Sequence, residues 1–275
     1  MVIVVKNIDV SIIIVDYNAG SLLENCVCSI ENNVKHSHEI IISDNGSNES
    51  ERSLLKNIET KYNNVKVIYN AVNFGFAKAN NIAAGIASGR VYHFLNPDTM
   101  VGNDIDSAYE YVLKDSSLSM YATTLYECGI QVNNPHIIET LGGYWKHYVE
   151  NKKFYWYIGA SYIMKKNVFK IIGKWPEDYF MYTEDLDFCY IARQKGIGIQ
   201  RLDCYIEHLG GGVSGKVWTN FERDVKKEIA LIKFYKKYNF MYNYFIRKVI
   251  MLGKRLFSME DFLYQFNVMI TALRG

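Results

Sequence analysis

The sequence predicts an α/β protein built on a mostly parallel central sheet flanked by helices. Three observations support this fold class: short apolar runs recur through the first hundred residues, helical patterns separate them, and polar turns follow them. Strands that alternate with helices form parallel sheets with right-handed crossovers. With 275 residues, 49% of them hydrophobic, the chain can bury a sizeable core.

The first four expected strands are short runs rich in Val and Ile, the composition of buried strands. Between them, apolar residues recur at three- and four-residue spacing, which predicts helices. The strands are VSIIIV (10–15), EIIIS (39–43), VKVIY (65–69) and VYHFL (91–95). The helices are expected within SLLENCVCSIENN, NESERSLLKNIETKY and GFAKANNIAAGIAS.

The chain from residue 118 to 215 is less regular but still predicts several elements. Thr183 is the expected N-cap of the longest helix here. In order, the elements are a strand near 118–123, a long loop or insertion over 126–154, a buried strand over 156–166, a helix over 167–172, a helix over 184–195, and a strand pair formed by GIQRL and CYIEHLGGGVSG.

Polar residues follow each of the first four expected strands. Because ligands of a parallel sheet bind beyond the carboxyl ends of its strands, we expect these turns to form one site. Taken singly, each residue could equally serve as a turn or cap residue. The residues are Asp16 and Tyr17 after the first strand, Asp44 after the second, Asn73 after the third, and Asn96 and Asp98 after the fourth.

The charge is concentrated in the last 60 residues. Residues 216–275 contain 12 Lys and Arg against five acidic residues, whereas residues 1–215 contain 19 against 24. We therefore divide the chain into a domain over 1–215 and a basic, aromatic-rich helical region over 216–275. This region either packs on the domain or on a second copy in a homo-oligomer, or rests on an anionic membrane. No nucleic-acid-binding module is recognisable, so no nucleic acid is expected as a partner.

Five cysteines without CxxC spacing or a leader peptide predict reduced thiols and a cytoplasmic location. The basic region could hold the protein at the inner face of the cytoplasmic membrane. Walker loops and Gly-x-Ser-x-Gly elbows do not occur in the sequence, which excludes common nucleotide triphosphatases and serine hydrolases.

Six sequence blocks, in order, resemble those of family-2 glycosyltransferases. They are VSIIIVDYNAGSLLENCVCSI, IISDNGSNES, NAVNFGFAKANNIAAGIASG, FLNPDT, IGASYIMKKNVFKIIGKWPEDYFMYTEDLDFC and EHLGGGVSG. The resemblance covers about residues 10–215 and is nearest to the rhamnosyltransferase-like branch that builds bacterial surface polysaccharides such as O-antigen. It implies a GT-A type nucleotide-diphospho-sugar transferase fold, a metal-assisted site and inversion at the anomeric carbon.

The resemblance also implies roles in nucleotide binding. Asp16 and Tyr17 would flank the base, and Asp44 would accept a hydrogen bond from a pyrimidine N–H. Asn73 and Asn96 complete the expected nucleotide-binding set. Asn96 occupies the first position of the family's Asp-x-Asp motif, a departure that leaves a weaker site for a hard cation.

Three further residues carry the chemistry that the resemblance implies. Asp98 matches the last carboxylate of the motif and, with His208, would hold Mn or Mg, because the leaving diphosphate needs charge stabilisation. Asp185 matches the catalytic base that deprotonates the acceptor hydroxyl. An inverting transfer needs one base, so the adjacent Glu184 is expected to be structural.

These features predict an enzyme that moves a sugar from a nucleotide-sugar donor to a lipid-linked saccharide acceptor. The first choice of donor is dTDP-rhamnose, and UDP-galactose, UDP-glucose or another nucleotide sugar is the alternative. The alternative from another class is a catalytically silent sugar-nucleotide-binding or assembly subunit, which Asn96 in place of an acid suggests.

Overall fold

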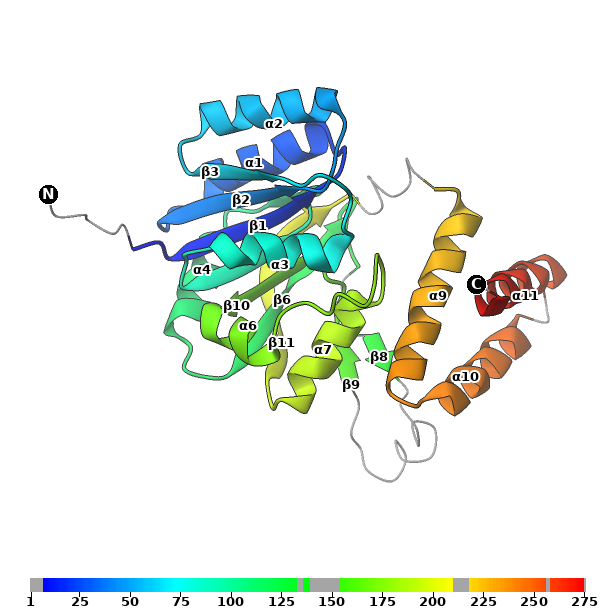
Figure 1. Ribbon diagram of the computed structural model, residues 1–275. Coiled ribbons are helices and arrows are strands. Elements are labelled where there is room, and N and C mark those ends of the chain that lie inside the picture. Colours follow the sequence, from blue (N-terminus) through cyan, green and yellow to red (C-terminus); the bar gives the residue numbers. More distant parts are fainter. Residues whose placement is uncertain (1–6, 133–135, 139–153, 210–217, 256–257, 275) are drawn as a thin grey trace, which may run out of the picture.

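The computed structural model describes residues 7–132, 136–138, 154–209, 218–255 and 258–274 (Figure 1). The glycine-rich end of the last sequence block and most of the predicted loop over 126–154 lie outside these residues.

The first hundred residues alternate between strands and helices as the apolar patterns predict, and element ends differ from expectation by two residues at most. The strands are β1 (Val10–Asp16), β2 (His38–Asp44), β3 (Val65–Tyr69) and β4 (Val91–Leu95). The helices between them are α1 (Ser21–Asn33), α2 (Glu49–Lys61) and α3 (Phe76–Ile86).

The second half contains more elements than the sequence predicts, because several of its strands have only two or three residues. The strands are β5 (Thr99–Val101), β6 (Ser119–Glu127), β7 (Ile130–Gln131), β8 (His136–Ile138), β9 (Phe154–Trp156), β10 (Ser161–Lys165) and β11 (Gly198–His208). The helices are α4 (Ile105–Lys114), α6 (Lys166–Ile172) and α7 (Glu184–Gln194).

Two expectations about strands in this half are wrong. The single buried strand predicted over 156–166 is divided between β9 and β10, which belong to different sheets. The predicted strand pair GIQRL and CYIEH is one continuous strand, β11, parallel to β6. A register shift between Leu202 and Tyr205 lets β11 continue, because two extra residues bulge from the ladder without ending it.

The main sheet has the strand order β3-β2-β1-β4-β10-β6-β11-β5, with β7 paired to β6. Strands β1 to β4 are mutually parallel, whereas β10 runs antiparallel to β4 and β6. The carboxyl ends of β1, β2 and β4 therefore lie at one edge, and the carboxyl end of β10 lies at the other.

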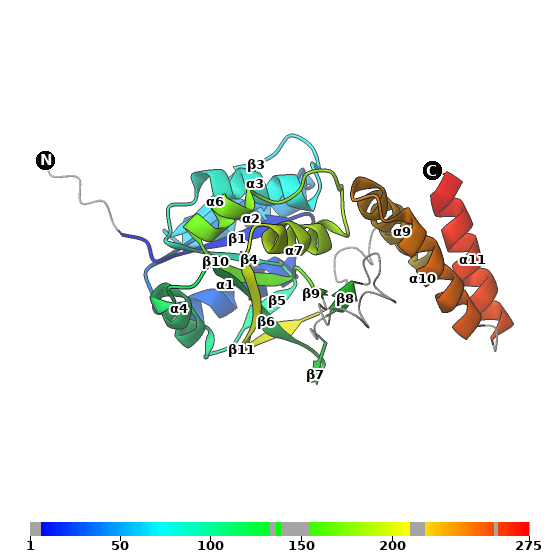
Figure 2. The same cartoon turned by 90° about the horizontal axis from the view of Figure 1, so that it is seen from below.

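Apolar side chains form two cores, one on each face of this sheet. Helices cover both faces (Figures 1 and 2). Alternation along β1 places Ile12 and Ile14 in one core and Ile13 in the other. Helices α1, α2 and α4 cover the first face, and α3, α6 and α7 cover the second. The central strands are thus buried on both faces, as parallel strands usually are.

The basic region forms three helices, α9 (Asn220–Lys237), α10 (Met241–Lys254) and α11 (Met259–Arg274). Helix α9 begins with a capping box in which Thr219 and Glu222 bond each other's backbone N–H. Its residues Ile232 and Phe234 join the core that also contains α7. No helix in the described ranges is long and apolar enough to cross a membrane.

A buried carboxylate joins α9 to α7. Asp187 of α7 has no exposed surface, and its two oxygens accept hydrogen bonds from Lys237 Nζ at 2.8 Å and Tyr238 Oη at 2.5 Å. Lys237 also contacts Asp178 at 2.7 Å, but that carboxylate is 49% exposed. These bonds attach α9, which lies beyond the boundary expected at residue 215, to α7.

We expect Asp187→Ala to lower the free energy of unfolding by about 1–3 kcal/mol, because a buried hydrogen-bonded carboxylate is lost while Lys237 can still reach water. Asp178→Ala removes the exposed partner of the same lysine and should cost under about 1 kcal/mol. Urea denaturation of the two full-length variants measures both. Equal losses would contradict the structural role assigned to Asp187.

Candidate active site

A cavity of about 470 Å³ opens at the edge of the sheet where β1, β2 and β4 end. Loops after these strands, the loop before α7 and one face of α9 supply its walls. Six of the eight residues expected in the site line it: Tyr17, Asn73, Asn96, Asp98, Asp185 and His208.

His208 lies between two carboxylates, those of Asp98 and Glu127. His208, at the end of β11, places Nε2 3.6 Å from Asp98 Oδ1 and Nδ1 3.1 Å from Glu127 Oε1. The Leu209 backbone N–H donates to the Asp98 carbonyl at 3.0 Å, which holds the end of β11 against the turn after β4. Asp98 and His208 are buried, at 6% and 8% exposure, although 110 residues separate them in the sequence.

Asn96, which also lines the cavity, has a buried side-chain oxygen without a partner in the described residues. Its backbone N–H donates to the Ala160 carbonyl at 2.9 Å, but its side-chain Oδ1 is buried and has no hydrogen-bond partner among the described residues. A buried acceptor without a partner destabilises the folded protein unless a ligand binds to it.

Asn96, Asp98 and His208 together offer an amide oxygen, a carboxylate and an imidazole, and this donor set fits Mn or Mg. Within the described part of the chain, no three Cys, His, Asp or Glu side chains form a complete metal cage. Mg²⁺ commonly binds through one or two carboxylates and completes its shell with water and substrate phosphates. The residues therefore fit a cation that binds together with a phosphate ligand.

Asp16 and Asp44, the other two expected residues, are fully buried and lie behind the cavity lining. Asp44 accepts from Arg52 Nε at 3.0 Å and from the Ser47 backbone N–H at 2.9 Å. Asp16 accepts from Ser47 Oγ at 3.2 Å, and burial together with the nearby Glu51 raises the pKa of Asp16. In this structure both carboxylates tie loops together.

In front of Asp16 and Asp44, the cavity is lined instead by Tyr17, Asn45 and Asn73. Asn45 Nδ2 donates to Asn73 Oδ1 at 2.8 Å, and the same oxygen accepts from the Gly75 backbone N–H at 2.9 Å. A Cβ at Gly75 would lie 2.3 Å from the Phe180 carbonyl oxygen. This glycine therefore allows the loop after β3 to touch the loop before α7.

The loop before α7 is strained. Tyr182 and Thr183 have φ values of 69° and 72°, a left-handed conformation that non-glycine residues seldom adopt. Thr183 occupies the predicted N-cap position, but its side chain makes no capping hydrogen bond. Such strain often occurs where the surrounding structure must direct functional side chains, and here it precedes Glu184 and Asp185.

Glu184 and Asp185 both line the cavity but have different partners. Asp185 accepts from the Gly159 backbone N–H at 3.1 Å and from the Leu186 backbone N–H at 2.8 Å. Burial raises the pKa of Asp185, and these N–H groups oppose the rise. Burial and the adjacent Asp185 raise the pKa of Glu184, whose buried Oε2 has no partner among the residues described.

Sequence reasoning missed several residues that line the cavity, including Glu127, Tyr182, Arg223 and Lys227. Glu127 falls in an irregular segment, and Arg223 and Lys227 belong to the region that we separated from the catalytic domain. The Thr219-x-x-Glu222 pattern could have located the start of α9, but not its position beside the cavity.

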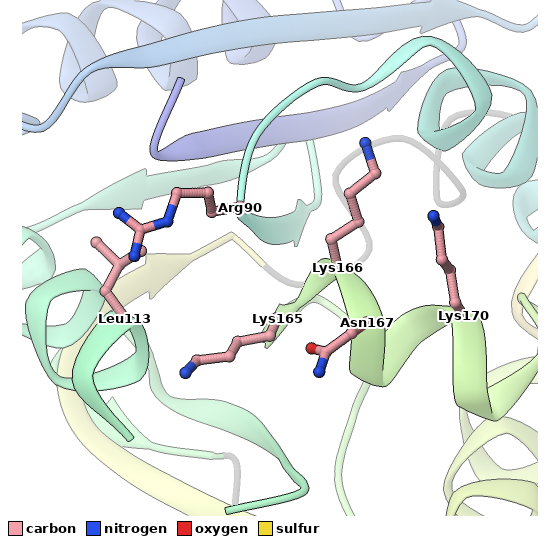
Figure 3. Close-up of a pocket in the computed structure, with 6 residues that line it drawn as sticks. All are labelled: Arg90, Leu113, Lys165, Lys166, Asn167 and Lys170. Atoms are coloured by element: carbon pink, nitrogen blue, oxygen red, sulfur yellow. The ribbon is translucent and has the colours of Figure 1, made fainter. Parts of the chain in front are cut away.

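A second hollow, of about 400 Å³, lies at the opposite edge of the sheet and is lined by four cations. Figure 3 shows that Lys166 and Lys170 point one way while Arg90 and Lys165 point another. Lys166 Nζ donates to the Ala87 carbonyl at 2.9 Å. The cations do not converge on a common point, so this hollow is not a second candidate for the active site.

Comparisons with known proteins identify the family of the chain. Residues 11–173 match the family described as Glycosyl transferase family 2, which is more than half of the chain. An uncharacterized glycosyltransferase of Haemophilus influenzae is 26% identical over 237 residues, covering 80% of this chain and 71% of that protein. A poly(ribitol-phosphate) β-glucosyltransferase of Bacillus spizizenii is 36% identical over 98 residues, 34% of this chain and 16% of the relative.

Solved structures share the fold at low sequence identity. A mannosyltransferase from Pyrobaculum calidifontis in complex with GDP-Man and Mn²⁺ has a TM-score of 0.61 at 15% identity, with 85% of this chain and 64% of that chain covered. GalNAc-T7 with UDP, GalNAc and Mn²⁺ has a TM-score of 0.59 at 18% identity, with 74% of this chain and 43% of that chain covered. TarS of S. aureus has a TM-score of 0.55 at 15% identity, with coverage of 83% and 72%.

The curled α/β sheet with loops gathered beyond β1, β2 and β4 is thus the GT-A fold, and the chain belongs to glycosyl transferase family 2.

Proposed function

We propose that the protein is an inverting, metal-assisted glycosyltransferase that moves a hexose from a nucleotide-sugar donor to a growing lipid-linked saccharide of the bacterial surface. The observation that carries this proposal is the meeting of Asp98, His208 and Asp185 at one cavity. Metal ligands and a candidate base are the two groups that such a transfer requires.

Asn96, Asp98 and His208 would hold a divalent cation, Mn or Mg. Once bound, the cation would stabilise the negative charge of the leaving diphosphate. The unpaired Asn96 oxygen supports its membership of this set, because an added ligand would satisfy a buried acceptor.

Asp185 would accept the proton of the attacking acceptor hydroxyl. Hydrogen bonds from the Gly159 and Leu186 N–H groups orient its carboxylate and favour the charged form that a base needs. A Cβ at residue 159 would lie 2.9 Å from Asp185 Cβ, so only glycine lets the backbone approach this closely. Glu184, with its raised pKa, would remain protonated near neutral pH.

The donor is proposed to be a pyrimidine nucleotide sugar, with dTDP-rhamnose as the first choice and UDP-galactose or UDP-glucose as alternatives. Tyr17 offers an aromatic ring for the base, and Asn73 offers an amide whose oxygen is held by Asn45. Asp44 would contact the base only after leaving Arg52. Because relatives bind UDP-GlcNAc or GDP-Man, these donors belong in the test panel. Product masses after incubation with each donor and Mn²⁺ or Mg²⁺ identify the substrate.

A catalytically silent sugar-nucleotide-binding subunit is the second candidate, and Asn96 at the first motif position is the observation that favours it. This candidate predicts donor binding without product across the whole panel.

The outer helices are proposed to bind an anionic membrane. Tyr242, Phe245 and Val249 on α10 recur at three- and four-residue spacing and are 68%, 48% and 70% exposed. Apolar residues are similarly exposed on α11, and the region they belong to carries a net charge of +7. Exposed apolar side chains next to basic ones suit an anionic lipid surface.

Asp98→Ala should abolish detectable transfer while far-ultraviolet circular dichroism stays unchanged, because the cation would lose its carboxylate ligand. A chelator should have the same effect on the wild-type enzyme. Asn96→Asp is the companion variant, and its added charge should raise the affinity for Mn²⁺. Full activity of Asp98→Ala in the presence of chelator would remove the metal from the mechanism.

Asp185→Asn should lower kcat about a hundredfold to ten-thousandfold with little change in donor affinity, because the amide cannot accept the proton. Glu184→Gln is the matched control at the adjacent acid, and its kcat should fall less. Steady-state kinetics and donor titration of both variants measure the difference. The reverse ranking would assign the base to Glu184.

The full-length protein should sediment with phosphatidylglycerol vesicles at low salt and be released as salt rises, since each basic residue near the surface contributes about 1 kcal/mol. Phe245→Ser with Val249→Ser should weaken sedimentation severalfold, whereas Ile86→Ser, an equally exposed apolar residue of α3, should not. Failure of the wild type to sediment, together with oligomer formation, would assign this face to protein packing.

A further inference from the structure

The cationic part of the cavity comes from outside the region that matches the family. Apart from His208, the basic residues that line it are Arg223 and Lys227, and both belong to α9. The matched region ends at residue 173. The acids that line the same cavity are Asp98, Glu127, Glu184 and Asp185.

Arg223 has spare hydrogen-bonding capacity in this cavity. Its Nη2 donates to Asn220 Oδ1, one turn earlier on α9. Its Nε is buried and has no partner among the residues the structure describes. A guanidinium presents five N–H donors in a fixed plane and suits phosphate oxygens, which can accept two parallel hydrogen bonds. Arg223 therefore meets the requirements of an anion-binding side chain.

Lys227 lies four residues later, on the same face of α9. Its Nζ is 5.4 Å from the centre of the Tyr182 ring, which also lines the cavity. Its nearest carboxylate oxygen, Asp224 Oδ1, is 3.9 Å away, at the limit of an ion pair. This ammonium group can turn toward a ligand without breaking a close ion pair.

The position of α9 is set by contacts at its far end. Lys237 and Tyr238 bind the buried Asp187, which lies two residues after Asp185 on α7. Lys233 Nζ also donates to the Asp178 carbonyl. The helix that carries the two cations is thus attached to the helix that carries the proposed base.

We propose that Arg223 and Lys227 bind the diphosphate of the nucleotide-sugar donor. This inference rests on the proposed function, and it follows from charge: a nucleoside diphosphate enters a cavity that already holds the carboxylates of Asp98, Glu127 and Asp185. One divalent cation offsets only part of that negative charge. Two cationic side chains beside it offset a further part, and charge-assisted hydrogen bonds to phosphate are stronger than neutral ones.

The test compares UDP with uridine, which lacks both phosphates. Dissociation constants are measured by calorimetry in the presence of Mn²⁺ for the full-length protein and for Arg223→Gln, Lys227→Met and Lys226→Met. Lys226 is the matched control, because it directly precedes Lys227 on α9 and its Nζ lies 4.8 Å from the centre of the Trp218 ring. We expect Arg223→Gln to weaken UDP binding at least tenfold, Lys227→Met about threefold to tenfold, and Lys226→Met less than twofold.

Uridine affinity and the melting temperature should remain the same in all four proteins. An unchanged UDP affinity in Arg223→Gln would overturn the proposed diphosphate site. Equal losses of affinity for UDP and for uridine would also overturn it, because α9 would then affect only the shape of the cavity. A wild-type protein that binds neither UDP, dTDP nor GDP would instead overturn the proposed function itself. The two failures are therefore distinguishable.

Discussion

Parallel pairing of β1 with β2 and β4 is the constraint on which the site depends. In this register Asp16 lies beside Asp44, and Ile14 beside Leu95. Each of these strands then ends at the same edge, and the loops that follow must share the space beyond it. The buried carboxylates of Asp16 and Asp44 hold two of these loops through Ser47, which donates to both.

Helix α7 connects the chemistry at this edge to the rest of the molecule. Asp185 and Asp187 are two residues apart, and successive residues on an α-helix differ by about 100°, so their side chains point in nearly opposite directions. Asp185 lines the cavity, and Asp187 binds α9. A single helix therefore places the proposed base and also fixes the helix that brings Arg223 and Lys227 to the cavity.

The first hundred residues could be predicted closely because each element there carries its own pattern. The runs before Asp16, Asp44 and Asn96 are short and rich in apolar β-branched or aromatic residues, and the helices between them have amphipathic spacing. The rule that parallel strands end at one edge then placed Tyr17, Asn73 and Asp98 in a common site before any contact was known. This rule could not say which polar side chains face the cavity, and Asp16 and Asp44 are buried behind it.

The sequence by itself determined the α/β class, the strand edge at which the cavity opens, and the positions of Asp98 after a strand and Asp185 at the start of a helix, because these depend on local periodicity and on residues next to strand or helix ends. Only the tertiary structure decided that β11 is one strand, that Glu127 contacts His208, and that α9 belongs to the cavity. The physical reason is that these contacts join residues far apart in the sequence, 81 positions in the case of Glu127 and His208, through side chains whose direction depends on packing and not on local pattern.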